Sequence, residues 1–243
     1  MKIGVFDSGI GGLTVLKEII DKYPNCEYIY YGDTLHLPYG EKTKKELLNL
    51  VSKIIEFFIT QKVDLVVIAC GTVSSTIYEE LSYLYDIKMI NIITTTIDKI
   101  KKDKINKLVV LATKKTIDSH VFSKNLDSTD VVEIACPNFV PYLERNIGNI
   151  NDILDEPLLK IKEQKINNIV LGCTHYPLLA KDIKSYLGYD VNFYNLGKIL
   201  ADTLNLTGNK FKLDMYFSFI DDNLLKNINK IIDKEKTIQK LVL

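Results

Sequence analysis

Arginine is almost missing from this chain of 243 residues. It occurs once, at Arg145, although lysine and arginine together number 31. The planar guanidinium fork of arginine grips carboxylates and phosphates through paired hydrogen bonds. A site for an anionic ligand must therefore rely mostly on backbone amides, hydroxyl groups and helix N-termini.

The chain also lacks an excess of charge of either sign, and it lacks any long apolar run. Aspartate and glutamate number 31, which equals the count of basic residues, so we expect neither a nucleic-acid partner nor an anionic membrane surface. No stretch approaches the roughly 20 apolar residues of a membrane span. The first residues show no apolar signal segment, so we expect a cytoplasmic protein.

Cysteine is sparse, and no two cysteines have the CxxC spacing; the four are Cys26, Cys70, Cys136 and Cys173. This excludes a disulfide scaffold and indicates reduced thiols. Two of the four stand in matching contexts. Cys70 ends the apolar run of DLVVIACGTVSS (64–75), and Cys173 follows the apolar run before LGCTHYPLL (171–179).

Apolar runs typical of buried strands alternate with helical patterns along most of the chain. The predicted strands are Ile3–Phe6, Glu27–Tyr31, Leu65–Ala69, Lys88–Ile92, Leu108–Ala112, Val131–Ala135, Asn168–Leu171 and Val191–Tyr194. Lys44–Phe58 is the clearest helical pattern, with an apolar residue at every third or fourth position. The alternation predicts an α/β protein with mostly parallel sheets.

The two cysteine turns occupy similar places in their runs of strands, which predicts two pseudo-symmetric α/β domains. We place the first domain at residues 1–94 plus 208–243 and the second at 95–207. The tail, with a predicted strand at Phe211–Phe217 and a helix at Asp221–Lys234, returns to the first domain. Ligands of open α/β sheets bind beyond the carboxyl ends of the strands, so we expect the active site in the cleft between the domains.

A glycine-rich turn, Asp7-Ser8-Gly9-Ile10-Gly11-Gly12, follows the first strand and leads into a helix. Its spacing differs from the GxGxxG fingerprint of dinucleotide sites. Glycines there let the backbone approach a ligand closely. The next strand leads into a polar loop that ends in Tyr39-Gly40, which as a short pattern is equally typical of a simple turn.

A single cysteine at a strand end is more often a small buried side chain than a nucleophile. Two in matching contexts, each followed by a hydroxyl residue and a predicted helix start, indicate chemistry. A helix N-terminus favours a thiolate by about 0.3–1 kcal/mol, up to about 2 when partly buried. Bringing an ordinary thiol to a pKa near 7 takes roughly 2 kcal/mol, so we expect Asp7 and His175 to assist.

Paired thiols suit a reaction that removes a proton from one face of a carbon and returns one to the other face. One sulfur must then be a thiolate and the other a thiol, and the reverse reaction exchanges these roles. A metal site formed by Cys70, Cys173, His175 and Asp7 is the competing interpretation. It lacks the short ligand spacing of most zinc sites, and we expect no metal.

Five segments together resemble the glutamate racemases of the cofactor-independent aspartate/glutamate racemase superfamily, over essentially the whole chain. The segments are GVFDSGIGGLTVLKE (4–18), YYGDTLHLPYG (30–40), IACGTVSS (68–75), ACPNFVPYLE (135–144) and LGCTHYPLL (171–179). The resemblance implies interconversion of L- and D-glutamate without a cofactor, with D-glutamate destined for peptidoglycan. It also implies a small-molecule substrate bound between two domains.

The resemblance further implies residue roles. Cys70 would be the base toward D-glutamate and Cys173 the base toward L-glutamate. Asp7 would assist Cys70, and His175 would assist Cys173. The substrate would be lined by Asp7, Ser8, Tyr39, Gly40, Gly71, Thr72, Thr174 and His175. Asp33, Thr113 and Glu144 also match family positions, with roles less defined.

The chain departs from the family pattern at Gly71, where asparagine is usual, so residue 71 can offer only its backbone. Val73 stands where alanine is usual, and Asn195-Leu196-Gly197 stands where an Asp-Ser pair usually precedes the glycine. Two alternatives stay open: an aspartate racemase or other isomerase of the superfamily, and a non-catalytic sensor that binds an amino acid. The sequence also leaves open whether the chain forms a homodimer.

Overall fold

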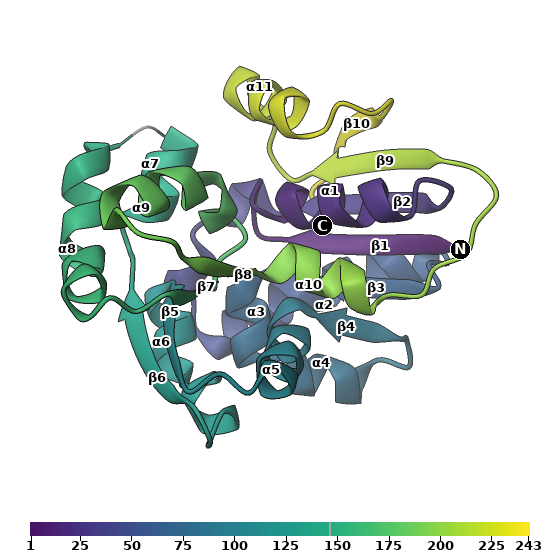
Figure 1. Ribbon diagram of the computed structural model, residues 1–243. Helices are drawn as coiled ribbons and strands as arrows, with labels where there is room; N and C mark the ends of the chain where they lie inside the picture. The colour runs from purple at the N-terminus through teal and green to yellow at the C-terminus, as the bar shows by residue number, and fades with distance from the viewer. Residues whose placement is uncertain (146) are drawn as a thin grey trace.

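The computed structural model describes residues 1–145 and 147–243, which form two parallel sheets flanked by helices (Figure 1). The first sheet has the strand order β10-β9-β2-β1-β3-β4 and the second the order β6-β5-β7-β8. The strands are β1 (Lys2–Asp7), β2 (Glu27–Gly32), β3 (Leu65–Ile68), β4 (Met89–Asn91), β5 (Lys107–Ala112), β6 (Asp130–Ala135), β7 (Asn168–Leu171), β8 (Asn192–Asn195), β9 (Lys212–Phe217) and β10 (Thr237–Lys240).

The two sheets repeat one topology. The order β2-β1-β3-β4 in the first matches β6-β5-β7-β8 in the second, and every pairing is parallel. Phe6 pairs with Ile68, the last residue of β3, and Leu111 pairs with Leu171, the last residue of β7. Cys70 and Cys173 thus follow equivalent strands, which confirms the predicted α/β fold with two similar halves.

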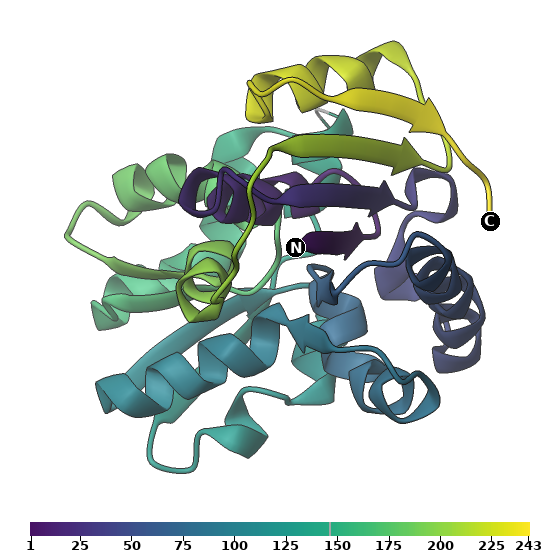
Figure 2. The same cartoon turned by 90° about the vertical axis from the view of Figure 1, so that its right-hand side faces the viewer.

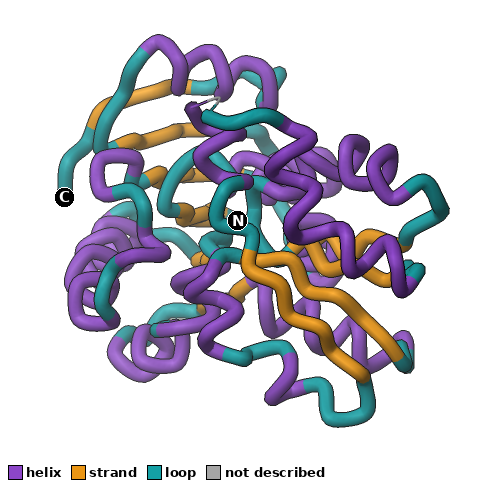
Figure 3. The backbone as a smooth tube through the Cα atoms, turned by 90° about the vertical axis from the view of Figure 1, so that its left-hand side faces the viewer, coloured by secondary structure: helices purple, strands orange, loops and turns teal. Residues whose placement is uncertain are grey.

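Eleven α-helices of the described chain connect these strands, and Figure 3 traces the alternation along the backbone. They are α1 (Gly12–Lys22), α2 (Lys44–Thr60), α3 (Gly71–Thr76), α4 (Tyr78–Leu84), α5 (Ile92–Asp103), α6 (Lys114–Ser119), α7 (Phe139–Arg145), α8 (Ile150–Gln164), α9 (Ala180–Leu187), α10 (Leu196–Thr203) and α11 (Asp222–Ile231). Short 3₁₀ turns are η1 (Thr34–His36), η2 (Tyr39–Glu41), η3 (Ser123–Asn125) and η4 (Tyr176–Leu179).

Buried side chains divide the helices into three layers. Helix α10 packs against both α1 and α5, and the apolar side chains of these three helices share one core with residues of both sheets. Helices α2, α3 and α4 cover the other face of the first sheet, and α7, α8 and α9 cover the other face of the second. The shared middle layer holds the two sheets together and fixes their loops against each other.

The tail returns to the first sheet, as Figure 2 shows for the yellow-green β9 and the yellow β10. Strand β9 pairs with β2 and places Lys212 opposite Glu27. Strand β10 then adds to β9. The tail's helix α11 contacts α1, so residues from the end of the chain lie close to the turn after β1.

The predicted elements agree with the structure except at a few ends. The predicted helix at Lys44–Phe58 is α2, which begins with a capping box: the Thr43 hydroxyl accepts from the Glu46 amide, and the Glu46 carboxylate accepts from the Thr43 amide. Strand β10 was not predicted. Within the described ranges no helix has the length and apolarity to cross a membrane.

Candidate active site

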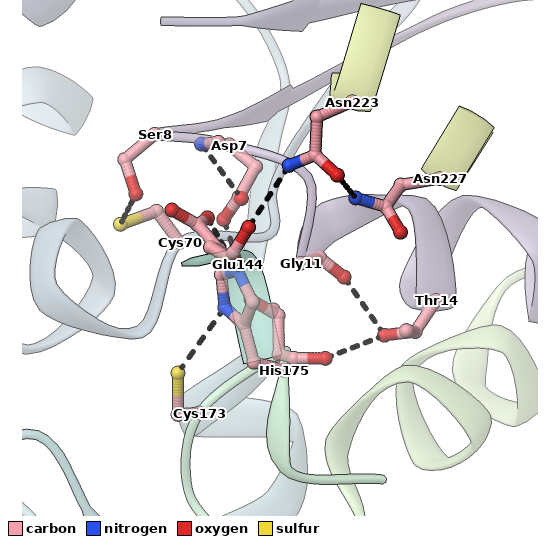
Figure 4. A network of polar contacts seen from close by, with 12 residues as sticks. Asp7, Ser8, Gly11, Thr14, Cys70, Glu144, Cys173, His175, Asn223 and Asn227 are labelled. Carbon is pink, nitrogen blue, oxygen red and sulfur yellow. Dashed lines mark hydrogen bonds and ion pairs between the residues drawn. The ribbon is translucent and has the colours of Figure 1, made fainter. Parts of the chain in front are cut away.

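The site lies where the loops after β1, β3 and β7 meet, between the two sheets (Figure 4). Asp7 is the last residue of β1, and Cys70 and Cys173 lie just beyond β3 and β7. All three side chains are buried, with exposed fractions of 1% for Asp7, 4% for Cys70 and 7% for Cys173. The parallel arrangement brings these loops to one edge, as the sequence predicts.

The Cys70 thiol donates to the Ser8 hydroxyl at 3.6 Å, and the helix α3 begins at the next residue. The pKa of Cys70 is raised to about 12, first by burial and then by the nearby Asp7 carboxylate, while hydrogen bonds with the Val73 amide and the Ser8 hydroxyl oppose the shift. The sequence predicts that the helix and the neighbouring groups lower the pKa of this thiol, whereas burial and Asp7 raise it. The desolvation of a fully buried sulfur outweighs the amides of a short helix.

Asp7 is held by backbone and side-chain donors. Its carboxylate accepts from the Gly9 amide at 3.0 Å and from the Thr174 hydroxyl at 3.5 Å, the latter contact reaching across to the second sheet. Burial raises the pKa of Asp7, although His175 and the amides of Gly9 and Gly12 oppose the shift. A buried carboxyl with a raised pKa is a candidate proton carrier.

Cys173 has a different partner, because its thiol lies 3.7 Å from Nδ1 of His175. Nε2 of the same ring lies 2.8 Å from the carboxylate of Glu144, on α7. Burial alone would lower the pKa of His175, but Cys173 and Glu144 together raise it well above its ordinary value. Thiol, imidazole and carboxylate thus form a continuous path for a proton.

The predicted helix start directly after Cys173 is not present. The chain forms the short turn η4 from Tyr176, and the α-helix α9 begins only at Ala180. The proline at residue 177 can occupy the first turn of a helix but cannot donate a backbone hydrogen bond. The second thiol therefore depends on His175 rather than on a helix terminus.

Three other residues that were predicted to line the substrate, Tyr39, Gly40 and Thr72, differ in their contacts. The Tyr39 hydroxyl donates a hydrogen bond to the carboxylate of buried Asp33 at 2.6 Å, so this hydroxyl proton is already engaged within the protein. Gly40 is partly exposed, and a Cβ there would meet nothing within 4 Å. Thr72 lies 3.4 Å from Thr113, hydroxyl to hydroxyl, which links α3 to the start of α6.

Gly71 faces the loop that carries the second thiol. A Cβ at residue 71 would lie 3.0 Å from the backbone carbonyl oxygen of Gly172. That distance is tighter than ordinary van der Waals contact, so the two backbones approach closely here because residue 71 has no side chain. The departure from asparagine therefore coincides with a close contact between the halves.

Two residues that sequence reasoning missed also reach this cluster. The Thr14 hydroxyl, in α1, donates to the Thr174 carbonyl at 2.8 Å, and the Asn223 amide, in α11, donates to the Glu144 carbonyl at 3.0 Å (Figure 4). Each contact joins parts of the chain that are far apart in sequence. No local pattern marks a threonine or asparagine for such a contact.

A polar cavity of about 300 Å³ lies between α3–α4 and α5, and neither cysteine lines it. Since both sulfur atoms are buried, a substrate reaches them only when the loops of the two sheets move apart. Across the described residues, no three His, Cys, Asp or Glu side chains are grouped as metal ligands.

Two repeated parallel α/β halves, with a cysteine just after the equivalent strand of each, have the fold of an amino-acid racemase, an isomerase. The family model for Asp/Glu/hydantoin racemases matches residues 26–203. The chain belongs to this family.

Similar proteins extend the likeness to nearly the full chain. A glutamate racemase of Thermoanaerobacter pseudethanolicus is 35% identical over 254 aligned residues, covering 96% of this chain and 94% of that protein. The structure resembles Bacillus anthracis glutamate racemase isoform RacE1, with a TM-score of 0.90, 27% identity and coverage of 99% and 97%. It also resembles Francisella tularensis glutamate racemase solved with D-glutamate, with a TM-score of 0.86, 27% identity and coverage of 100% and 97%.

Proposed function

We propose that this enzyme interconverts L- and D-glutamate by a two-base proton transfer at the α-carbon, without a metal or organic cofactor. The observation that carries the proposal is the pair of buried thiols at equivalent strand ends, with the Asp7 carboxyl near Cys70 and the His175 ring 3.7 Å from Cys173. The names of the similar proteins support glutamate as the substrate. The product D-glutamate would serve peptidoglycan synthesis, and we place the enzyme in the cytoplasm.

In the direction from L-glutamate, the Cys173 thiolate takes the α-proton and becomes a thiol. The electron pair of the broken C–H bond stays on the substrate as a planar carbanion conjugated with its carboxylate. The Cys70 thiol then donates a proton to the opposite face and becomes a thiolate. No electron leaves the substrate, so the step needs neither an oxidant nor a reductant.

After one turnover the two sulfur atoms have exchanged protonation states. Asp7 on the Cys70 side and the His175–Glu144 pair on the Cys173 side can restore them by carrying protons. Burial raises the pKa values of both Asp7 and Cys70, which favours the protonated forms of these two groups. The positive α-ammonium group of a bound amino acid would lower the pKa values of both Asp7 and Cys70, because a nearby positive charge favours the charged form of an acid.

The scarcity of arginine bears on how the substrate carboxylates are held. The single Arg145 is exposed. We assign the carboxylates instead to hydroxyl groups and backbone amides of the lining residues, which are Ser8, Thr72 and Thr174 for hydroxyls and Gly40 and Gly71 for amides, with Tyr39 packed beside them. Such donors bind a charged group well when they are preorganised in a site closed to water.

One experiment tests the function directly. The purified protein is incubated in deuterated water with L-glutamate, D-glutamate or L-aspartate, and loss of the α-proton is followed by NMR with and without a chelator. We expect exchange and racemisation with both glutamate enantiomers, unaffected by chelation. Exchange with aspartate alone would assign an aspartate racemase. No exchange with any of the three would indicate a sensor, and a requirement for metal or pyridoxal phosphate would contradict the cofactor-free mechanism.

A further inference from the structure

The helix α11 belongs to the tail of the chain, yet one of its side chains reaches the proton path of the second thiol. The Asn223 side-chain amide donates to the backbone carbonyl of Glu144 at 3.0 Å. Figure 4 places Asn223 and Asn227 on the yellow helix directly beside the cluster of Glu144 and His175. The tail that completes the first sheet therefore contacts the helix α7 of the second half.

The contacted carbonyl is one that α7 cannot satisfy by itself. Glu144 is the penultimate residue of the seven-residue helix α7. The last four carbonyl groups of a helix have no partner within that helix. A short helix also gains little stability from its own hydrogen bonds. The amide of Asn223 thus closes the end of α7 at the residue whose side chain faces His175.

The Glu144 carboxylate lies against the His175 ring and close to the backbone of Gly9. Its Oε1 atom lies 2.8 Å from Nε2 of His175, and a Cβ added at Gly9 would lie 2.9 Å from the same oxygen. The side chain therefore fits into a gap between the loop after β1 and the His175 ring. A displacement of the Glu144 backbone would move its carboxylate relative to the His175 ring, and the hydrogen bond between them at 2.8 Å would be strained or lost.

The donor itself is oriented. Asn223 lies in the first turn of α11, which the Asp221 side chain caps by accepting from the Leu224 amide at 2.7 Å. Leu224 and Ile228 are buried and anchor the helix. The Asn227 amide lies 3.5 Å from the Asn223 side-chain oxygen, which leaves the Asn223 NH₂ group directed at α7.

We propose that Asn223 is a positioning residue for the Cys173 side of the reaction: its hydrogen bond to the Glu144 carbonyl holds the Glu144 carboxylate on His175. This inference rests on the proposed function. It predicts an effect on one direction of racemisation, because only the proton path of Cys173 passes through His175 and Glu144.

The test uses Asn223→Asp, which keeps the shape of the side chain but removes its donor. A carboxylate in the first turn of a helix interacts favourably with the helix dipole, so α11 should stay folded. Asn229→Asp, an exposed position on the same helix, adds the same charge as a control. We expect kcat from L-glutamate to fall about three- to tenfold, as for the loss of one hydrogen bond, with kcat from D-glutamate changed less than about twofold.

Two further readouts separate positioning from a general effect. The primary isotope effect on kcat with α-deuterated L-glutamate should rise in Asn223→Asp, and the amides of α7 should exchange faster with deuterated solvent. Equal losses in both directions, a change in KM alone, or the same losses in Asn229→Asp would overturn the proposal. If the wild-type protein does not racemise glutamate, the proposed function fails, and unchanged exchange of the α7 amides would then reject the contact independently.

Discussion

The hydroxyl of Thr14 donates to the backbone carbonyl of Thr174 at 2.8 Å, across 160 positions of the chain. Thr174 stands between Cys173 and His175, so the first helix of the chain holds the loop that carries the second thiol. The same hydroxyl lies 2.9 Å from the Gly11 carbonyl, and its single proton is shared between the two acceptors. Separation of the loops for substrate entry leaves Thr14 with an alternative acceptor, which lowers the cost of opening.

Replacing either thiol should stop racemisation while leaving the fold intact. We expect Cys70→Ser and Cys173→Ser each to lower kcat by at least about 10²–10⁴-fold, because a hydroxyl is too weak an acid to replace a thiol as general acid or base. Racemisation by circular dichroism and the far-UV spectrum are the measurements. Cys26→Ser is the control, since Cys26 is buried in the core outside the site. Near-normal activity of either site variant would remove that cysteine from the mechanism.

Asp7→Asn should make the protein more stable and less active. The raised pKa of Asp7 means that the folded state binds its proton more tightly than the unfolded state, so stability falls as pH rises from about 3.8 through the folded value. Each unit of raised pKa amounts to about 1.4 kcal/mol, or roughly 3–6 °C in Tm for a protein of this size. We expect Tm to rise at pH 7.

The difference in Tm should vanish at a pH below 3.8, where wild-type Asp7 is protonated in both states. Activity of Asp7→Asn should fall, most strongly in kcat from D-glutamate, because Asp7 lies beside Cys70. Thermal melts across this pH range make the comparison. A Tm that is lower than wild type at pH 7 and independent of pH would show that the hydrogen bonds of Asp7 outweigh its burial.

His175→Asn and Glu144→Gln should act on the opposite direction. We expect kcat from L-glutamate to fall by about 10²-fold for His175→Asn and by less for Glu144→Gln, since His175 contacts the Cys173 thiol and Glu144 acts through the ring. The equilibrium constant ties the two kcat/KM values together, so the asymmetry must be sought in kcat and isotope effects. His120→Asn, which alters an exposed histidine, should change neither.

Gly11→Ala should destabilise the site by steric overlap. Gly11 has φ −59° and ψ −37°, so alanine fits the backbone conformation. Its Cβ would nevertheless lie 2.3 Å from Nδ1 of His175 and 2.3 Å from the Thr174 hydroxyl. We expect a loss of about 1–3 kcal/mol in the free energy of unfolding, measured by urea denaturation. Gly40→Ala is the comparison for stability, since a Cβ there meets nothing, and an equal loss in both variants would contradict the steric explanation.

Sequence reasoning succeeded where the signal is local. The continuous apolar runs predict buried parallel strands, and cysteines just beyond two of them are placed together by the fold itself. Strand β10 was not predicted because Thr237–Lys240 is a short strand with mostly exposed side chains at the edge of the sheet, so its sequence has no pattern of buried residues.

Electrostatics and long-range contacts could not be predicted in the same way. The raised pKa of Cys70 depends on complete desolvation, which only the packing of both halves produces. The contacts of Thr14 and Asn223 depend on how far apart the two sheets lie. No local sequence pattern around these two residues indicates that distance. The proton partners of the thiols were nevertheless predicted by their place beside the motifs, and they remain proposals for experiment.

The pairing of β9 with β2 also sets the order in which a nascent chain can fold. Thr34, just after β2, bonds to Phe219, just after β9, across 185 positions. While the ribosome is still making the residues between them, the edge of β2 is open, and its sequence EYIYYG is aromatic and carries a single charge. Such an edge is prone to pair with other chains. Residues 107–195 can meanwhile complete the second sheet, so the enzyme's greatest risk of misassembly falls on its first strands, which wait longest for their neighbour.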